Sequence, residues 1–202
     1  MSFNVNPFGE IKNTTDRGTL IGNRGELKVE HGELIGPSRW KTQSWIFCSI
    51  DEKFKPKGED TRRYTKLFFM DEFTALAAGH RPCGYCLPER YEAFIAAWLA
   101  NNPEYGYGKY DYKKIDRVFH YERKNSDRSK QTYPDKLANL PDGVMVTLDV
   151  ATGESFLLQG RLLRKWSPIG YSEPLSYDLD TTVQVLTPKS IVNTIAAGFL
   201  RP

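Results

Sequence analysis

The sequence predicts an α+β protein, in which an N-terminal unit of strands and two short-to-medium helices packs on a mostly antiparallel β unit with a closing helix. Residues 1–103 contain a hairpin signal, short alternating strands and two helical segments. Residues 141–202 contain alternating apolar runs separated by turn residues, with a strand and a helix at the end. Residues 104–140 form a basic, tyrosine-rich connection between the two units.

The composition is typical of a soluble globular protein, with 40% hydrophobic and 26% charged residues. No apolar run approaches the roughly 20 residues that span a bilayer. The start "MSFNVNPFGEIKNTTDRG" lacks the basic beginning and the apolar middle of a signal peptide. We therefore expect a cytoplasmic protein without a membrane partner, in which thiols stay reduced. Three cysteines, an odd number, also disfavour a disulfide framework.

Strand signals dominate the N-terminal part. The stretch "GELKVEHGELIG" (25–36) predicts a hairpin with His31 at its surface. The stretch "RWKTQSWIFCSI" (39–50) predicts a strand whose alternation places Trp45 and Phe47 on one face and Cys48 on the other. A second strand is predicted at "YTKLFF" (64–69).

Two helices are predicted next. Asp71 is a suitable N-cap for the first helix, and Gly79 can end it in the left-handed conformation. Pro88 suits the first position of the second helix, which we expect to end by Pro103. The second helix has an apolar face formed by Tyr91, Phe94, Ile95, Trp98 and Leu99.

Basic residues and tyrosines are interleaved between Lys109 and Lys136. This segment contains nine Lys/Arg and five Asp/Glu, an excess of +4 (9 − 5), compared with +3 for the whole chain. Such a mixture suits a phosphate backbone and exposed bases, although a solvated loop can have the same composition. The sequence therefore predicts DNA or RNA as a partner. The predicted contacts are Lys113, Lys114, Arg117, Arg123, Lys124, Arg128 and Lys130.

The stretch "AAGHRPCGYCLPERYEAF" (77–94) contains a Cys-x-x-Cys pair, Cys83 and Cys86. Such a turn offers two thiolates to a tetrahedral Zn²⁺. Cys48, 35 residues upstream of Cys83, can supply a third. The predicted helix that begins after Cys86 favours anionic thiolates at its N-terminus. We therefore predict Zn²⁺ as a cofactor, bound by all three cysteines.

The stretch "FFMDEFTALAAGHRPCGYC" (68–86) resembles the zinc-binding domain of the Ada DNA-alkylation repair proteins, a domain that also occurs attached to some nucleases. The shared pattern is a strand with paired aromatics, a short helix and Ala-Gly-x-Arg-Pro-Cys-x-x-Cys, within residues 45–90. The resemblance implies an Ada-like zinc unit and a role in DNA repair or cleavage. The C-terminal half is similar only to bacterial proteins of comparable length, which implies no activity.

The Ada family also has an upstream Cys-x₃-Cys pair. Cys48 matches one of its positions, and Glu52 stands at the other. In Ada proteins, a metal-bound cysteine of this pair accepts a methyl group from DNA phosphotriesters. The resemblance makes Cys48 its counterpart, but the missing second cysteine puts this role in doubt.

The fourth metal ligand remains open. We favour His120, in "FHYERK", and keep His80 and Glu52 as alternatives. A protein ligand in the fourth place would make the site structural, whereas a water there would allow hydroxide chemistry.

Two other functions remain possible. His120 and Glu122, beside Arg123, could serve as the acid and base of a metal-dependent hydrolase that acts on a small or nucleotide-like substrate. Alternatively, "CGYC" looks like the active site of a thioredoxin-type thiol-disulfide oxidoreductase. In those enzymes a long buried strand directly precedes the pair, whereas here a helix ending in Ala-Ala-Gly precedes Cys83, and Cys48 would have no role.

Overall fold

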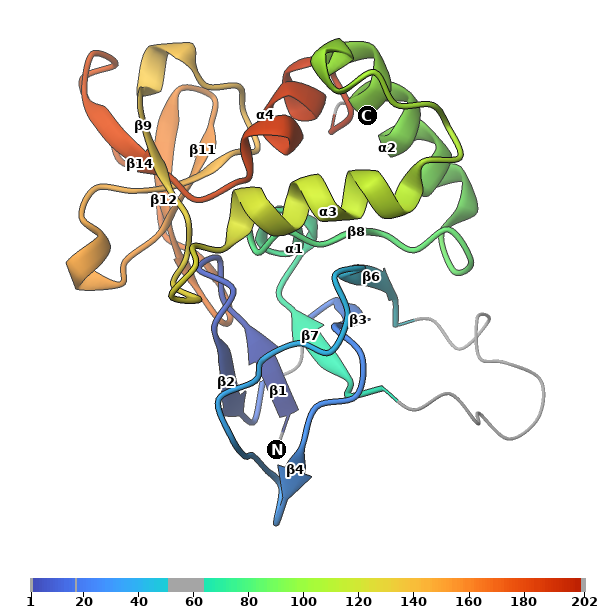
Figure 1. Ribbon diagram of the computed structural model, residues 1–202. Coiled ribbons are helices and arrows are strands. Elements are labelled where there is room, and N and C mark those ends of the chain that lie inside the picture. Colours follow the sequence, from blue (N-terminus) through green and yellow to red (C-terminus); the bar gives the residue numbers. More distant parts are fainter. Residues whose placement is uncertain (1, 17, 51–63, 201–202) are drawn as a thin grey trace.

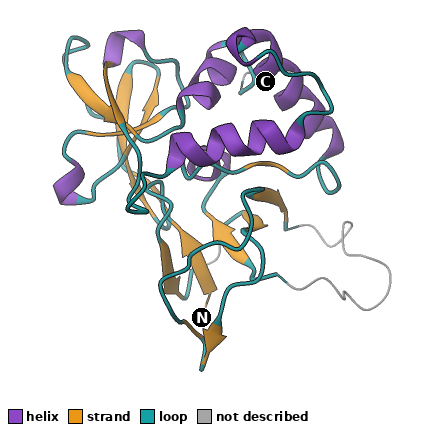
Figure 2. Cartoon of the chain, viewed as in Figure 1, coloured by secondary structure: helices purple, strands orange, loops and turns teal. Residues whose placement is uncertain are grey.

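The structure, a computed structural model, describes residues 2–16, 18–50 and 64–200. These residues form an α+β protein, as predicted. In Figure 1 the N-terminal sheet lies at the bottom, the C-terminal sheet at the upper left, and most of the helical segments at the upper right. Figure 2 shows the same arrangement by secondary structure, with helix α3 lying above the N-terminal sheet and below α2 and α4.

The N-terminal sheet has six strands in the order β2-β1-β7-β3-β6-β8. β1 pairs with β7 and β6 pairs with β8 in parallel, whereas the other neighbours are antiparallel. β4 and β5 form the predicted hairpin, with His31 exposed in its turn. The bounds are β1 Ser2–Val5, β2 Ile11–Thr14, β3 Leu20–Asn23, β4 Val29–Glu30, β5 Glu33–Leu34, β6 Ile46–Ser49, β7 Leu67–Phe69 and β8 Arg81–Pro82.

The C-terminal sheet has six strands in the order β13-β12-β11-β10-β14-β9. All its pairings are antiparallel, as the sequence predicts. Strand β9 comes from the segment 104–140, so this segment contributes directly to the C-terminal sheet. The bounds are β9 Tyr133–Lys136, β10 Met145–Thr147, β11 Phe156–Gln159, β12 Leu162–Ser167, β13 Gly170–Tyr171 and β14 Thr182–Val185.

Helices α1 and α2 begin as predicted. α1 (Glu72–Ala77) is capped by Asp71, whose carboxylate accepts from the N–H of Thr74 at 2.8 Å. Gly79 follows with φ +82°, and an added Cβ there would lie 2.5 Å from Cδ of Arg123. α2 (Pro88–Asn101) has Pro88 as its first residue. Its buried face is formed by Phe94, Ile95 and Trp98.

The two later helices flank the C-terminal sheet and α2. α3 (Tyr112–Arg123) is the main element of the basic connecting segment. α4 (Lys189–Ala196) is the predicted closing helix and packs against α2 and α3. No helix in the described ranges is long and apolar enough to cross a membrane.

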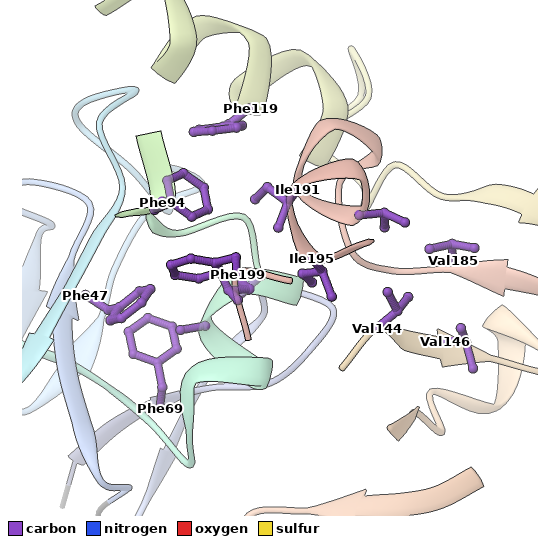
Figure 3. Close-up of a cluster of buried hydrophobic side chains, with 14 of the residues drawn as sticks. Phe47, Phe69, Phe94, Phe119, Val144, Val146, Val185, Ile191, Ile195 and Phe199 are labelled. Carbon is purple, nitrogen blue, oxygen red and sulfur yellow. The ribbon is translucent and has the colours of Figure 1, made fainter. Parts of the chain in front are cut away.

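One hydrophobic core joins both sheets through the helices (Figure 3). The rings of Phe94 on α2 and Phe199 after α4 meet edge to face with their centroids 5.1 Å apart. Because the two units share this core, the position of α3 relative to β8 is fixed by packing. The core side chains labelled in the figure are Phe47, Phe69, Phe94, Phe119, Val144, Val146, Val185, Ile191, Ile195 and Phe199.

Candidate metal centre

The register of two strands brings Cys48 next to Cys83. β6, which carries Cys48, runs parallel to β8, with Phe47 opposite Pro82. The backbone N–H of Cys83 donates to the carbonyl of Phe47 at 2.9 Å. Trp45 and Phe47 are buried, and Cys48 is only half-buried, so the predicted alternation of this strand is confirmed.

A tight turn brings Cys86 back towards Cys83. The backbone N–H groups of Tyr85 and Cys86 donate to the sulfur of Cys83. Gly84 permits close packing of this turn, because an added Cβ would lie 3.1 Å from the ring of Tyr91 on α2. The turn is therefore held from inside by N–H···S bonds and from outside by α2.

The sulfur atoms of Cys48, Cys83 and Cys86 all lie within 4.8 Å of one another. Zinc bonded to three thiolates at about 2.3 Å would hold these sulfurs roughly 3.8 Å apart, so small movements are enough to close the cluster on a metal. Cys83 is buried, and the other two cysteines are half-buried. The predicted convergence of the three cysteines is confirmed, and they could hold a metal ion.

The thiols of this cluster differ in acidity. A hydrogen bond from Cys48, together with the N–H groups of Cys86 and Tyr85, lowers the pKa of Cys83 to about 5, although burial opposes the shift. The same contact with Cys83, followed by burial, raises the pKa of Cys48. Cys83 is therefore the thiol that ionises first, and the thiolate is the form that binds metals.

His80, an alternative fourth ligand, is a core residue. Its Nε2 accepts from Nε of Arg24 at 3.2 Å, and its ring packs on Trp45 and Phe69 with centroids 5.0 and 4.6 Å away. Burial, followed by the charges of Arg24 and Arg123, lowers the pKa of His80 well below 6.5. The ring is therefore neutral, with its proton on Nδ1.

His120, the favoured fourth ligand, contacts two tryptophans. Its ring centroid lies 5.5 Å from that of Trp40 and 6.5 Å from that of Trp45. Its Nδ1 lies 3.2 Å from Nη2 of Arg123. Burial, followed by Arg123 and Lys124, lowers the pKa of His120 to about 4. The imidazole is therefore neutral at physiological pH.

Neither histidine joins the three sulfurs among the residues that the structure describes. Glu52, the remaining candidate, lies outside the described residues. The structure thus assembles three ligands and does not bring His120 or His80 to the fourth position.

The predicted acid–base pair is not assembled, because His120 and Glu122 contact different neighbours. The Glu122 carboxylate accepts from the N–H of Ser190 at 3.1 Å and from its hydroxyl at 2.6 Å. The hydroxyl of Tyr105 donates to it at 3.4 Å. Burial raises the pKa of Glu122 in spite of the bonds from Ser190. Glu122 stabilises the first turn of α4 and lies two residues from His120, on a different side of α3.

A buried ion pair connects the metal-site strand to α3. Arg81, two residues before Cys83, donates to both carboxylate oxygens of Asp116 at 2.6 and 2.9 Å. The hydroxyl of Ser44, from the segment before β6, donates to the same carboxylate at 2.5 Å. This contact fixes the first half of α3 against β8.

The predicted nucleic-acid contacts separate into three groups. Lys113, Lys114, Arg117 and Arg128 are exposed. Arg123 is buried and donates to the carbonyls of Gly79 and Gln43, and Lys130 donates to the carbonyl of Ala77. Lys124 is half-buried. Arg123 and Lys130 therefore hold backbone carbonyls and do not present their charges on an outer surface, contrary to the sequence prediction.

Sequence reasoning missed the role of Arg24. It is fully buried, and its guanidinium carbon lies 3.8 Å from the ring centroid of Trp45, as does that of Arg123. The stretch "IGNRG" around Arg24 has the composition of an ordinary turn, and no local pattern signals a buried cation. The contact could be found only from the tertiary structure.

Comparison of the chain with family models, with curated proteins and with solved structures finds no match in any of the three.

Proposed function

We propose that the protein binds one zinc ion per chain through Cys48, Cys83 and Cys86. The observation that carries this proposal is the convergence of three sulfurs, from two distant segments, within 4.8 Å. Three thiolates are a soft donor set, which favours Zn²⁺ over hard cations such as Mg²⁺ and Ca²⁺. When bound, the metal would cross-link β6 to the turn before α2, so its first role is to stabilise this part of the fold.

We further propose that the protein binds nucleic acid through one face of α3 and a tyrosine just before the helix. Lys113, Arg117 and Tyr121 recur every four residues and share one side of α3, and Tyr110 lies two residues before the helix; these four residues are called the α3 face. Tyr110 is 87% exposed and Tyr121 is 65% exposed. Neither Lys113 nor Arg117 forms an ion pair with a described carboxylate. Free cations beside exposed rings suit phosphates and unstacked bases.

The Arg81–Asp116 pair supports a link between the metal site and the α3 face. It joins the strand that precedes Cys83 to the helix that carries Lys113 and Arg117. Zinc at the three cysteines would stiffen that strand, and through the ion pair it would stabilise the position of α3. The resemblance to the Ada zinc unit favours DNA as the nucleic acid, with repair or cleavage as its setting.

Elemental analysis of the purified protein tests the metal proposal. We expect one zinc per chain in the wild type and none in Cys48→Ser, with Thr15→Ser as a control that leaves the zinc content unchanged. Cobalt substitution should give thiolate-to-metal charge-transfer absorption, and this absorption should weaken in Cys86→Ser. A metal-free wild-type protein that forms a reversible Cys83–Cys86 disulfide would instead support the oxidoreductase alternative.

Fluorescence anisotropy with labelled DNA tests the α3 face. Affinity should fall steeply with salt, and Lys113→Ala/Arg117→Ala should reduce the log–log salt slope by about 1.4 to 1.8, because each of the two lost phosphate contacts removes about 0.7–0.9. The control is Lys28→Ala/Arg161→Ala, which removes the same charge from exposed positions on other elements. Binding that ignores salt, or that weakens equally in both double variants, contradicts the proposal.

The hydrolase alternative lacks a paired acid and base at His120 and Glu122. It would regain support if zinc-loaded protein hydrolysed a small phosphate ester and Glu122→Gln lost the activity without losing stability.

A further inference from the structure

A cleft of about 670 Å³ opens beyond the C-terminal end of α3. The β1–β2 turn, the loop before β6 and the segment after α3 form its walls. Trp40 lines the cleft, and Glu10 is its only carboxylate among the described lining residues. The cations that line it are Lys12, Arg39, Lys124, Arg128 and Lys130. Five cations and one acid in a concave site create a positive potential that attracts anions.

Two buried arginines lie behind this cleft and carry unused donors. Arg24 donates from Nη1 to the carbonyl of Gly9, a lining residue, at 2.9 Å. Its Nη2 is buried without a partner and lies 3.6 Å from where a Cβ on Gly9 would stand. Nε of Arg123 is also buried without a partner. Arginine stays protonated in proteins, so both groups keep their charge even though burial lowers their pKa.

The cations at the back of this cleft lack a direct ion pair with a described carboxylate. Arg24, Arg123, Lys124 and Lys130 form no ion pair with any described acid, and the nearby Asp116 is occupied by Arg81. Glu10 accepts from the amide of Asn6 at 2.9 Å and pairs with Lys12 at 3.7 Å on the exposed side of the cleft. Burial, followed by the charge of Arg24, lowers the pKa of Lys124 to about 8. Buried charges without a counter-charge are costly, and a bound anion would compensate them.

We propose that this cleft binds a phosphate monoester, with the phosphate between Lys124 and Arg128. A dianion matches the uncompensated charge better than a carboxylate does, and lysine and arginine are the usual phosphate ligands. Trp40 offers a ring to a planar group on the ligand, and the guanidinium of Arg128 lies 5.8 Å from its centroid. The volume suits a ligand of mononucleotide size. The simplest occupant is therefore a nucleotide, either free or at the phosphorylated end of a strand.

This site does not depend on the proposed function. None of its lining residues belongs to the α3 face or to the three cysteines. The tests of zinc binding and of nucleic-acid binding by the α3 face could fail while the cleft still binds phosphate. The cleft could also fail to bind phosphate while those two tests succeed.

Isothermal titration calorimetry on the full chain tests the site with inorganic phosphate, adenosine monophosphate and adenosine. We expect one phosphate or nucleotide per chain, and adenosine at least about tenfold weaker than its monophosphate, because the charge-assisted bonds are lost. Lys124→Gln and Arg128→Gln should each weaken the nucleotide about tenfold or more. Inorganic phosphate and adenosine monophosphate should raise the melting temperature of the wild type. Neither should raise the melting temperature of Lys124→Gln.

The matched control is Lys113→Ala/Arg117→Ala, which should bind the nucleotide as the wild type does. Because Lys124→Gln removes an uncompensated charge, the variant should remain folded, and its circular dichroism spectrum checks this. Competition with a 5′-phosphorylated and an unphosphorylated oligonucleotide tells whether the natural ligand is a strand end or a free nucleotide. If only the phosphorylated oligonucleotide displaces adenosine monophosphate, the ligand is a strand end. If neither oligonucleotide displaces it, the ligand is a free nucleotide. No saturable phosphate or nucleotide binding, or binding unchanged in both cleft variants, overturns the proposal.

Discussion

Arg81 and Asp116 form a two-pronged ion pair in the interior, with Nε–Oδ1 at 2.6 Å and Nη2–Oδ2 at 2.9 Å. Both side chains are more than 90% buried. The pair joins the first residue of β8, two residues before Cys83, to the first half of α3. It therefore couples the metal-site geometry to the helix that carries the exposed basic face.

Asp116→Asn should lower the free energy of unfolding by about 3–5 kcal/mol, because it leaves a buried guanidinium without its counter-charge. Urea denaturation of the full chain measures this. The control is Asp111→Asn, near the start of the same helix, where the ion pair with Lys114 is exposed and little change is expected. Equal effects of the two changes would show that the buried pair has no special role.

Glu122→Ala should lower the free energy of unfolding by about 1–3 kcal/mol, because the N–H and hydroxyl of Ser190 lose their acceptor at the start of α4. The zinc content should stay unchanged, since Glu122 has no contact with the sulfurs. Glu104→Ala, at an exposed position, is the control. A loss of metal in Glu122→Ala with stability intact would contradict the assigned capping role.

Acid should destabilise the protein partly through His80. Its pKa is lowered in the folded state by burial and by Arg24 and Arg123, so below pH 6.5 the unfolded chain binds a proton that the folded chain excludes. The contribution of His80 to stability is therefore complete above pH 6.5 and is lost as the pH falls. Denaturation at several pH values, at matched metal content, should show a shallower loss in His80→Gln than in the wild type. His31→Gln, in the exposed hairpin turn, should follow the wild type.

Nucleotide binding in the cleft should weaken above about pH 8, where Lys124 loses its proton. Burial lowers the pKa of Lys124 most, Arg24 and Arg123 lower it further, and Glu10 and Asp127 raise it. Phosphate monoesters, whose second pKa is about 6, are already dianionic there, so the loss comes from the protein. Lys124→Arg should keep its charge and move the decline to higher pH. A wild-type affinity that stays constant from pH 7 to 9.5 would contradict the assignment of Lys124 as a ligand.

Local chemistry made much of the fold predictable. Asp71 and Gly79 mark the ends of α1, and Pro88 marks the start of α2, because caps and prolines act through their own backbone neighbours. The alternation of Trp45, Phe47 and Cys48 follows from the period of a strand. The clustering of the three cysteines was also predictable, since cysteines are few in this chain and two of them form a Cys-x-x-Cys turn.

Contacts between distant segments were not predictable. His80, His120 and Glu122 look alike from sequence as candidate site residues, yet their partners Arg24, Trp40 and Ser190 come from remote parts of the chain. Charge is equally ambiguous, because the helical period alone does not tell which cations of 109–136 face outwards.

The sequence by itself determined the caps of α1, the start of α2 and the place of the hairpin, and which three thiols are available to a metal. Only the tertiary structure decided that β6 runs beside β8, that Arg123 and Lys130 hold carbonyls in the interior, and that a cationic cleft lies beyond α3. The physical reason is that capping and strand periodicity depend on neighbours in sequence, whereas burial and charge compensation depend on neighbours in space.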